Sequence, residues 1–297
     1  MTDLLTDALR SALVFDKRPS GIYTEEYVRR AHELKDVTSR LKHDAEEMLH
    51  DSDALMSENL HRIAFRSGLG ATLHPDHVPT HTLSALKEYT ARHLTAQNVA
   101  FVGVGVSQEA LQSALASTDA AIFPTGKTAS ATASSYYGGE ARIATLSHGE
   151  TDYALAFEGT SASSADAPAL AALTAYLGGA VERVKWSPGV SALSQVSDAT
   201  GVRAQAFNVA YSDAGLFGLR FTGECGRLRP ALDKGIDALK KVAEGKVDAK
   251  ELTRAVSQAK FDALSAVETR AGRTAFAGKE VIHHYFSFVQ QSIQTSV

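Results

Sequence analysis

Three histidines close to an aspartate give this sequence its clearest potential for metal chemistry. His74, His77 and His81 lie within one short segment that also holds Asp76. Imidazole and carboxylate groups are common zinc ligands. Two prolines interrupt the segment, however, so no helix or strand would hold the side chains on one face. We interpret the segment as a polar surface loop, with a metal site as the alternative.

A second histidine pair lies near the C-terminus. His283 and His284 follow Glu280 in a segment with helical periodicity. Adjacent residues of a helix point about 100° apart, so the two imidazoles cannot both ligate one ion. We therefore expect a solvated or interfacial helix face.

A glycine pair follows an apolar run, as phosphate-binding glycines follow a strand. Gly103 and Gly105 match the start of a dinucleotide fingerprint, but the positions where the third glycine would stand hold Ser107 and Gln108. Glycines that relieve crowding at a strand end explain the pair equally well. Nucleotide binding is not expected.

Other signatures of catalysis are missing from the sequence. It has no Gly-x-Ser-x-Gly elbow, no glycine-rich loop ending in Lys-Ser or Lys-Thr, no His-Glu-x-x-His and no His-x-x-Glu-His. The single cysteine, Cys225, excludes an internal disulfide and a cysteine-based zinc cluster, and we expect it to be small and half-buried. We therefore predict no catalytic, cofactor-binding or metal-binding residue.

Composition predicts a folded protein with both helices and strands. The chain has 297 residues, is 44% hydrophobic and carries a formal net charge of -4. It has no basic stripe, so nucleic acid is not an expected partner. No apolar stretch reaches the roughly 20 residues of a membrane span, and the acidic residues within 1–10 are atypical of a transit peptide.

The first part of the chain is predicted to be mainly helical. Helices are expected over 4–13, 24–50, 53–66 and 82–95, and from a Ser107 cap to 116. The glycines of 67–70 should end the third helix. The valine-rich run 99–106 predicts a strand buried on both faces of a sheet.

The second part combines strands and helices. Strands are expected over 140–146, 153–157, 206–211 and 216–221, with a hairpin turn at 212–215, and helices over 165–177, 228–244 and 273–291. Another helix begins with Asp248 and Glu251 at capping-box spacing. Its predicted buried face consists of Leu252, Val256, Ala259, Ala263 and Val267.

Three stretches carry a family resemblance. They are 58–70, then Gly178-Gly179 leading to Trp186-Ser187-Pro188-Gly189, then the hairpin segment 207–218 with its Tyr-Ser-Asp-Ala-Gly-Leu-Phe-Gly motif. Together they resemble the pitrilysin-type (M16) zinc peptidases, and within them the fungal forms of the core 2 branch found in the cytochrome bc1 complex. The resemblance extends over most of the chain in the same order.

The resemblance implies an α+β fold with mixed sheets flanked by helices in two similar domains, the first incomplete. On this basis residues 1–117 are the C-terminal part of the first domain, 118–134 the linker and 135–297 the second domain. The chain would then be truncated at both ends relative to the family. Apolar surface on the run 99–106 and on the first helices would be left uncovered, which predicts a sticky or partly ordered first third.

The resemblance also implies a function. It predicts a non-catalytic structural core subunit of mitochondrial ubiquinol–cytochrome c reductase, peripheral on the matrix side of the inner membrane. The implied partners are a core 1 type subunit, cytochrome b, cytochrome c1 and the iron–sulfur protein, and no cofactor is implied for this chain. Trp186 and Phe217 are expected to be packing or interface residues.

Two other functions remain open within the same family. The α subunit of the mitochondrial processing peptidase binds presequences through a flexible glycine-rich loop. The corresponding region here, 178–189, contains only Gly178, Gly179 and Gly189 and includes the bulky Trp186, which favours the structural role. The other alternative is an active zinc peptidase whose catalytic segment is encoded upstream of Met1.

Overall fold

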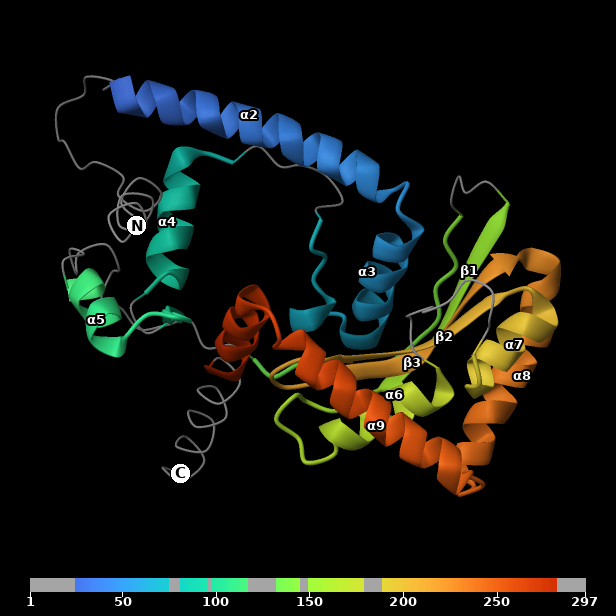
Figure 1. Ribbon diagram of the computed structural model, residues 1–297. Coiled ribbons are helices and arrows are strands. Elements are labelled where there is room, and N and C mark those ends of the chain that lie inside the picture. The colour runs from blue at the N-terminus through green and yellow to red at the C-terminus, as the bar shows by residue number, and fades with distance from the viewer. Residues whose placement is uncertain are drawn as a thin grey trace, which may run out of the picture.

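The computed structural model describes residues 25–74, 81–95, 98–116, 132–144, 149–178 and 189–281 (Figure 1). At its centre is a three-stranded sheet in the order β1-β3-β2. The strands are β1 (Glu150–Glu158), β2 (Arg203–Ala210) and β3 (Gly215–Glu224). β3 pairs antiparallel with both neighbours. The combination of helices with a sheet confirms the expected α+β fold class.

A tight turn joins β2 to β3, as the sequence predicts. The backbone N–H of Tyr211 donates to the carbonyl of Ala214 at 2.8 Å, and Ala210 pairs with Gly215. A Cβ on Gly215 would lie 2.3 Å from the carbonyl oxygen of Thr160. Glycine is therefore required here by the close approach of two backbone segments.

One face of the sheet is covered by three helices, α6 (Ala167–Leu177), α7 (Ala192–Thr200) and α8 (Cys225–Ala243). Phe217, Leu219 and Phe221 of β3 alternate toward this face and are buried in the main hydrophobic core. A Cβ on Gly235 would lie 2.5 Å from the Phe221 ring, so glycine lets α8 approach the sheet closely. Phe217 is thus a packing residue, as expected.

α9 (Ala249–Ala266) packs against α6, and its start confirms the predicted cap because Asp248 accepts a hydrogen bond from the N–H of Glu251 at 2.9 Å. The predicted buried face is wrong in part. Ala255 is the buried residue, whereas Leu252 is 44% exposed and Ala263 is exposed. The last residues of α9, 260–266, are all exposed. A further helix covers 270–281.

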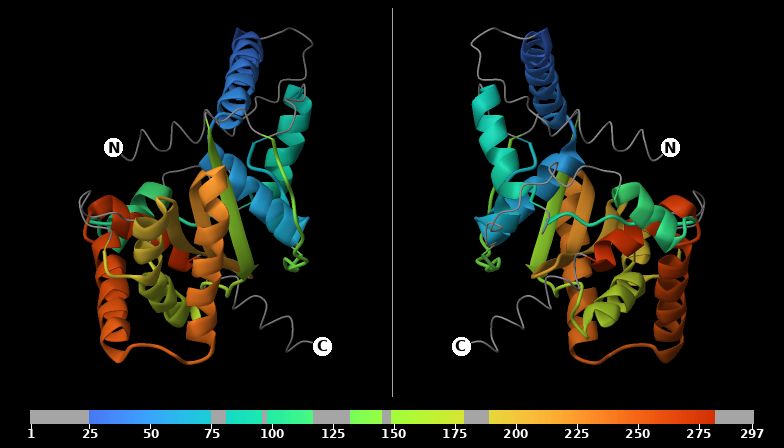
Figure 2. Two further views of the ribbon diagram at one scale, coloured as in Figure 1. Left: turned by 90° about the vertical axis from the view of Figure 1, so that its right-hand side faces the viewer. Right: turned by 90° about the vertical axis from the view of Figure 1, so that its left-hand side faces the viewer.

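The N-terminal region consists of helices in the described residues. They are α2 (Glu25–Met48), α3 (Ser52–Phe65), the short 3-10 turn η1 (Gly68–Gly70), α4 (Leu83–His93) and α5 (Gln108–Ala116). The hydroxyls of Thr82 and Ser107 cap α4 and α5, which confirms both predicted starts. In Figures 1 and 2 the long α2 stands away from the sheet, and α3 leads from it back to the sheet.

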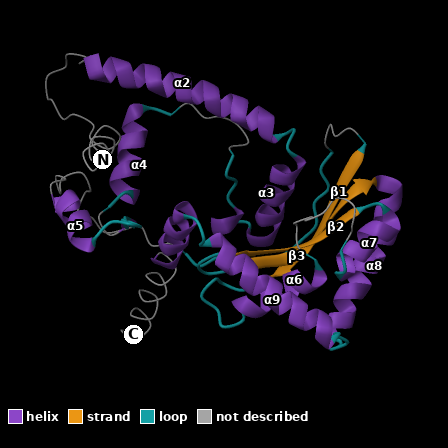
Figure 3. Cartoon of the chain, in the orientation of Figure 1, coloured by secondary structure: helices purple, strands orange, loops and turns teal. Residues whose placement is uncertain are grey.

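The predicted strand over 99–106 is wrong. Residues 101–106 have no regular structure, and Val106 is 55% exposed. A strand is stable only when a neighbouring strand takes up its backbone hydrogen bonds, and among the described residues the three strands of Figure 3 pair with one another instead. For the same reason the predicted strand over 140–146 is wrong at 140–144, which are also irregular.

Several predictions fall on residues outside the described ranges. They concern the helix over 4–13, the cap of α2, Asp76, His77, Trp186, His283, His284, and the part of the last helix beyond 281. Most of the proposed linker, 118–134, also lies there. The domain boundaries therefore stay predictions.

Candidate functional site

α3 lies over the face of the sheet opposite to the main core. In the register of β1 with β3, Asp152 is opposite Thr222 and Ala154 is opposite Arg220. Alternation along the strands turns these side chains away from Phe221 and toward α3. α3 contacts β1, so helix and sheet enclose a layer of side chains between them.

A cluster of charged groups occupies one end of this layer. The Nη2 of Arg220 donates to the Asp152 Oδ1 at 2.9 Å and also bonds to the carboxylate of Asp53 in α3. The hydroxyl of Thr222 donates to the same Asp152 oxygen. The Arg220 and Asp152 side chains are only 13% and 14% exposed. Charges so far from solvent need a close partner, which each supplies to the other.

The surroundings lower the pKa of Asp152 and raise the pKa of Arg220, so both side chains are held in their charged forms. Burial raises the pKa of the Asp152 carboxyl, but hydrogen bonds from Thr222, Arg220 and Ser52 outweigh it, and the net pKa is below the usual aspartate value. Burial lowers the pKa of Arg220, whereas its bonds to Asp53 and Asp152 raise it above the usual value. The cluster is therefore an ion pair and not a poised acid or base.

The other end of the layer is apolar. Ala64 and Phe65 of α3 form a buried cluster with Leu216 of β3, against which Leu69, Tyr136, Phe207 and Ala214 pack. The rings of Phe65 and Tyr136 meet edge to face at 6.3 Å. A Cβ on Gly218 would lie 2.6 Å from the Phe207 ring, so glycine makes room for that ring on the sheet.

His61 and Tyr211 join helix and hairpin between these two ends. The His61 Nδ1 is 2.7 Å from the carbonyl oxygen of Ser57, and its Nε2 is 2.7 Å from the hydroxyl of Tyr211. Because a carbonyl only accepts, Nδ1 carries the proton and Tyr211 donates to Nε2. Burial raises the pKa of Tyr211, so this hydroxyl remains protonated and able to donate.

Of the histidines singled out by the sequence, His74 and His81 lie within the described residues. The backbone N–H and the Nδ1 of His74 both contact the Glu58 Oε1 at 2.9 Å, while His81 is exposed. Throughout the described ranges no three His, Cys, Asp or Glu side chains are grouped so that they could hold a metal ion. His74 fastens the loop after η1 to α3.

Three other positions singled out by the sequence are plain surface features. Gly103 and Gly105 lie in an irregular segment rather than at the end of a strand. Cys225, predicted to be half-buried, is exposed at the start of α8, where residues 224–227 are all exposed.

The charged cluster is the feature that the sequence analysis missed. Arg220 is a charged residue inside the expected apolar strand 216–221, which is a visible signal, whereas Asp152 lies just before the expected strand 153–157. Their pairing depends on the register of β1 and β3, and that register is known only from the structure.

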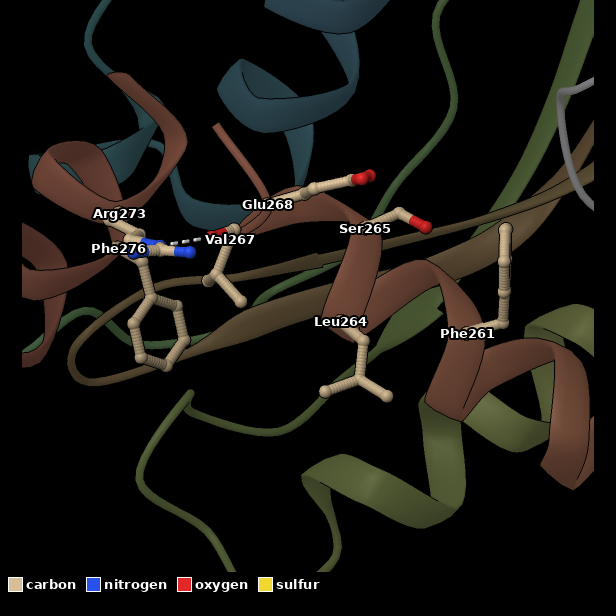
Figure 4. Close-up of a pocket in the computed structure, with 7 residues that line it drawn as sticks. All are labelled: Phe261, Leu264, Ser265, Val267, Glu268, Arg273 and Phe276. Carbon is tan, nitrogen blue, oxygen red and sulfur yellow. Dashed lines mark hydrogen bonds between the residues drawn. The ribbon is translucent and has the colours of Figure 1, made fainter. Parts of the chain in front are cut away.

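A shallow apolar groove lies where α9 meets the helix over 270–281 (Figure 4). Phe261, Leu264 and Phe276 line it, and the Arg273 Nε donates to the carbonyl of Val267 at 2.9 Å across its rim. Ser265, Val267 and Glu268 complete the lining, which suits an apolar side chain with a polar edge.

Comparison with known families decides the classification. A family profile described as "Peptidase M16 inactive domain" matches residues 80–259, which is more than half of the chain. The chain belongs to the peptidase M16 family. The resemblance seen in the sequence is therefore confirmed.

Curated relatives of this M16 chain include subunits of two mitochondrial assemblies. It is 34% identical over 258 residues to cytochrome b-c1 complex subunit 2 of Neurospora crassa, covering 84% of this chain and 56% of the relative. It is 29% identical over 266 residues to mitochondrial-processing peptidase subunit alpha-2 of Dictyostelium discoideum, covering 85% and 57%. The chain thus spans about half the length of the curated relatives it matches.

Solved structures share the M16 fold. A chain of complex III from Candida albicans superposes with a TM-score of 0.75 at 15% identity, covering 95% of this chain and 66% of that one. A peptidase M16 inactive domain from Pseudomonas fluorescens superposes with a TM-score of 0.65 at 18% identity, covering 89% and 64%. At these identities the likeness concerns the fold.

Proposed function

We propose that this M16 chain is a non-catalytic structural core subunit of the mitochondrial ubiquinol–cytochrome c reductase, complex III. The observation that carries the proposal is its 34% identity, over 84% of the chain, to the Neurospora crassa cytochrome b-c1 subunit. A second fungal relative of the same description, from Cryptococcus neoformans, is 34% identical over 223 residues.

The chemistry of the described residues supports a structural role. The best-formed polar site, the cluster of Arg220, Asp152 and Asp53, directs its hydrogen bonds at its own members. The lowered pKa of Asp152 keeps this carboxylate ionised at neutral pH and paired with Arg220. By itself the polypeptide would hold neighbouring subunits and would not hydrolyse peptides.

The partners follow from the same proposal. They are a core 1 type subunit, cytochrome b, cytochrome c1 and the iron–sulfur protein, with this chain peripheral on the matrix side of the inner membrane. Among the residues described, none of the helices combines the length and hydropathy that a membrane crossing requires. Attachment would therefore run through the partner subunits and through surfaces such as the groove of Phe261 and Phe276.

A presequence-binding α subunit of the processing peptidase is the alternative function. The Dictyostelium discoideum relative supports it, at a lower identity than the fungal subunits. The glycine-poor region 178–189 supports the structural role instead, because only three of its residues have the backbone freedom of glycine.

Affinity purification of the native gene product from mitochondria tests the proposal. The chromosomal gene would be tagged, the complexes extracted in mild detergent, and the partners identified by mass spectrometry, with an unrelated tagged matrix protein as the control. Recovery of cytochrome b, cytochrome c1 and the iron–sulfur protein is expected. Recovery of a zinc-bearing processing-peptidase subunit without these proteins would overturn the structural role and favour the presequence-binding function.

A further inference from the structure

We infer that Arg220 is a positioning residue that fixes the orientation of α3, and of α2 that leads into it, on the sheet. The inference concerns a conformational device inside the chain and does not depend on the proposed assembly. It rests on the two chemically different contacts that α3 makes at its two ends. We name the group formed by Asp53, Asp152, Arg220 and Thr222 the Arg220 clasp.

The apolar end of α3 supplies attraction without fixed direction. Phe65 and Ala64 are buried against Leu216, and burial of apolar surface is favourable in many relative orientations. A helix held only here, by the Phe65 contact and the His61–Tyr211 hydrogen bond one turn away, could pivot about the Phe65 ring while keeping most of the buried area. A second attachment is needed to select one crossing angle.

The Arg220 clasp supplies this second attachment at the far end of the helix. α3 has 14 residues and is therefore about 20 Å long, with Asp53 in its first turn and Phe65 at its last position. Hydrogen bonds between charged groups are directional and stronger than neutral ones. Contacts at opposite ends of a rigid helix prevent both pivoting and rotation.

Arginine has the geometry that this role requires. Its planar guanidinium presents several fixed N–H donors, so one side chain binds Asp152 within the sheet and Asp53 in the helix. Asp152 in turn accepts hydrogen bonds from Thr222 and from Ser52, the first residue of α3. The cation therefore stands between a carboxylate of the sheet and one of the helix.

Removal of the Arg220 side chain would turn the attraction between α3 and the sheet at this end into repulsion. Without Arg220, the carboxylates of Asp152 and Asp53 would face each other with no positive charge between them. An unpaired carboxylate in a partly buried site is strongly unfavourable. Separation of the N-terminus of α3 from the sheet would relieve it, and this predicts local opening of α3 while the main core stays closed.

The contact also crosses the predicted linker at 118–134. α3 precedes this segment in the chain, whereas β1 and β3 follow it. The Arg220 clasp thus couples the orientation of the N-terminal helices to that of the sheet. In Figure 1, α2 continues from the start of α3, so a rotation of α3 would displace α2 along its whole length.

Hydrogen exchange on the full 297-residue chain tests the inference in two variants. Arg220→Met keeps the length of the side chain and removes its charge. Arg203→Met is the matched control, because Arg203 pairs with Thr222 in the sheet register and has only a 4.0 Å exposed contact with Glu150. We expect exchange of the α3 amides to become about 10- to 100-fold faster in Arg220→Met, with α8 and β3 unchanged. The control should leave α3 as in the wild type.

A distance measurement separates positioning from general stabilisation. Spin labels would be attached through Ser39→Cys on α2 and Lys234→Cys on α8, in a parent chain from which Cys225→Ser has removed the native thiol. The distance distribution should be narrow in the parent and broad or shifted in Arg220→Met. An unchanged distance, or an equal rise of exchange in α3 and the core, would overturn the inference.

Asp53→Asn provides a second route if Arg220→Met does not fold. Asp53 is 71% exposed, so the substitution leaves the sheet intact and weakens only the helix side of the clasp. We expect α3 exchange about 3- to 10-fold faster. Exchange at the wild-type rate in this variant would also contradict the inference.

Discussion

The two faces of the sheet contact their helices through different kinds of interaction. The face with Phe217, Leu219 and Phe221 packs against α6, α7 and α8 through apolar side chains. The opposite face joins an apolar cluster around Phe65 to the charged Arg220 clasp. The first face holds the larger cluster of buried apolar residues, whereas the second fixes the direction in which a helix leaves the sheet. Stability and orientation are thus assigned to opposite faces.

The largest effect is expected from emptying the apolar face. Phe221 is fully buried against α8, and Phe221→Ala should lower the free energy of unfolding by about 4 kcal/mol through lost burial and a residual cavity. Urea denaturation followed by circular dichroism measures this. A loss below about 1 kcal/mol would show that this face is not the main source of stability.

A somewhat smaller and local effect is expected from the same change on the second face. Phe65→Ala removes the anchor of α3 and should lower the opening free energy of the α3 amides by about 3 kcal/mol, measured by native-state hydrogen exchange. Amides of β3 and α8 should change less. If both sets fall equally, the two faces form one cooperative unit and the comparison fails.

Acidification should weaken the second face selectively. The folded-state pKa of Asp152 is lowered, so its stabilisation is fully present above the unfolded pKa of about 3.8 and is lost as the pH falls through the folded value. Asp152→Asn, which cannot titrate, should cost about 1.5–3 kcal/mol at neutral pH. The difference in urea midpoint between wild type and variant should be steady from neutral pH to about pH 4 and should shrink only at more acid pH, below the unfolded pKa. A difference that does not shrink anywhere in that acid range would disprove the linkage.

The smallest effect is expected at the contact between hairpin and helix. Tyr211→Phe removes the hydroxyl that donates to His61 and should cost about 1 kcal/mol of unfolding free energy. The edge-to-face contact of the two rings, with centroids 5.6 Å apart, would remain. Thermal denaturation of wild type and Tyr211→Phe under identical conditions measures the difference. A loss as large as that of Phe65→Ala would show that this hydrogen bond, and not the apolar cluster, anchors α3.

Sequence periodicity and capping residues were sufficient to place most helices. Asp248 and Ser107 begin helices where their side chains predicted it, and the hairpin at 212–215 has the expected turn. These features depend on residues close in sequence. The run at 99–106 shows the limit, because an apolar segment becomes a strand only beside a partner that its own residues do not specify.

The Arg220 clasp was beyond sequence reasoning for a related reason. A slip of one residue between β1 and β3 would turn Arg220 and Asp152 to different faces, so their contact depends on the register. The family resemblance, by contrast, was visible in short motifs that follow one another in the expected order along the chain and needed no such information.

The outer side of β2 has a consequence for aggregation. The outward N–H groups of Ala204 and Ala206 donate to the Ser197 hydroxyl at 2.9 Å and to the Gly178 carbonyl at 2.7 Å. An edge strand with free N–H groups is a template for strands of other molecules. Here these two N–H groups already donate to Ser197 in α7 and to Gly178 at the end of α6. They are not available to a strand of another molecule, so this edge of β2 disfavours the growth of an intermolecular sheet.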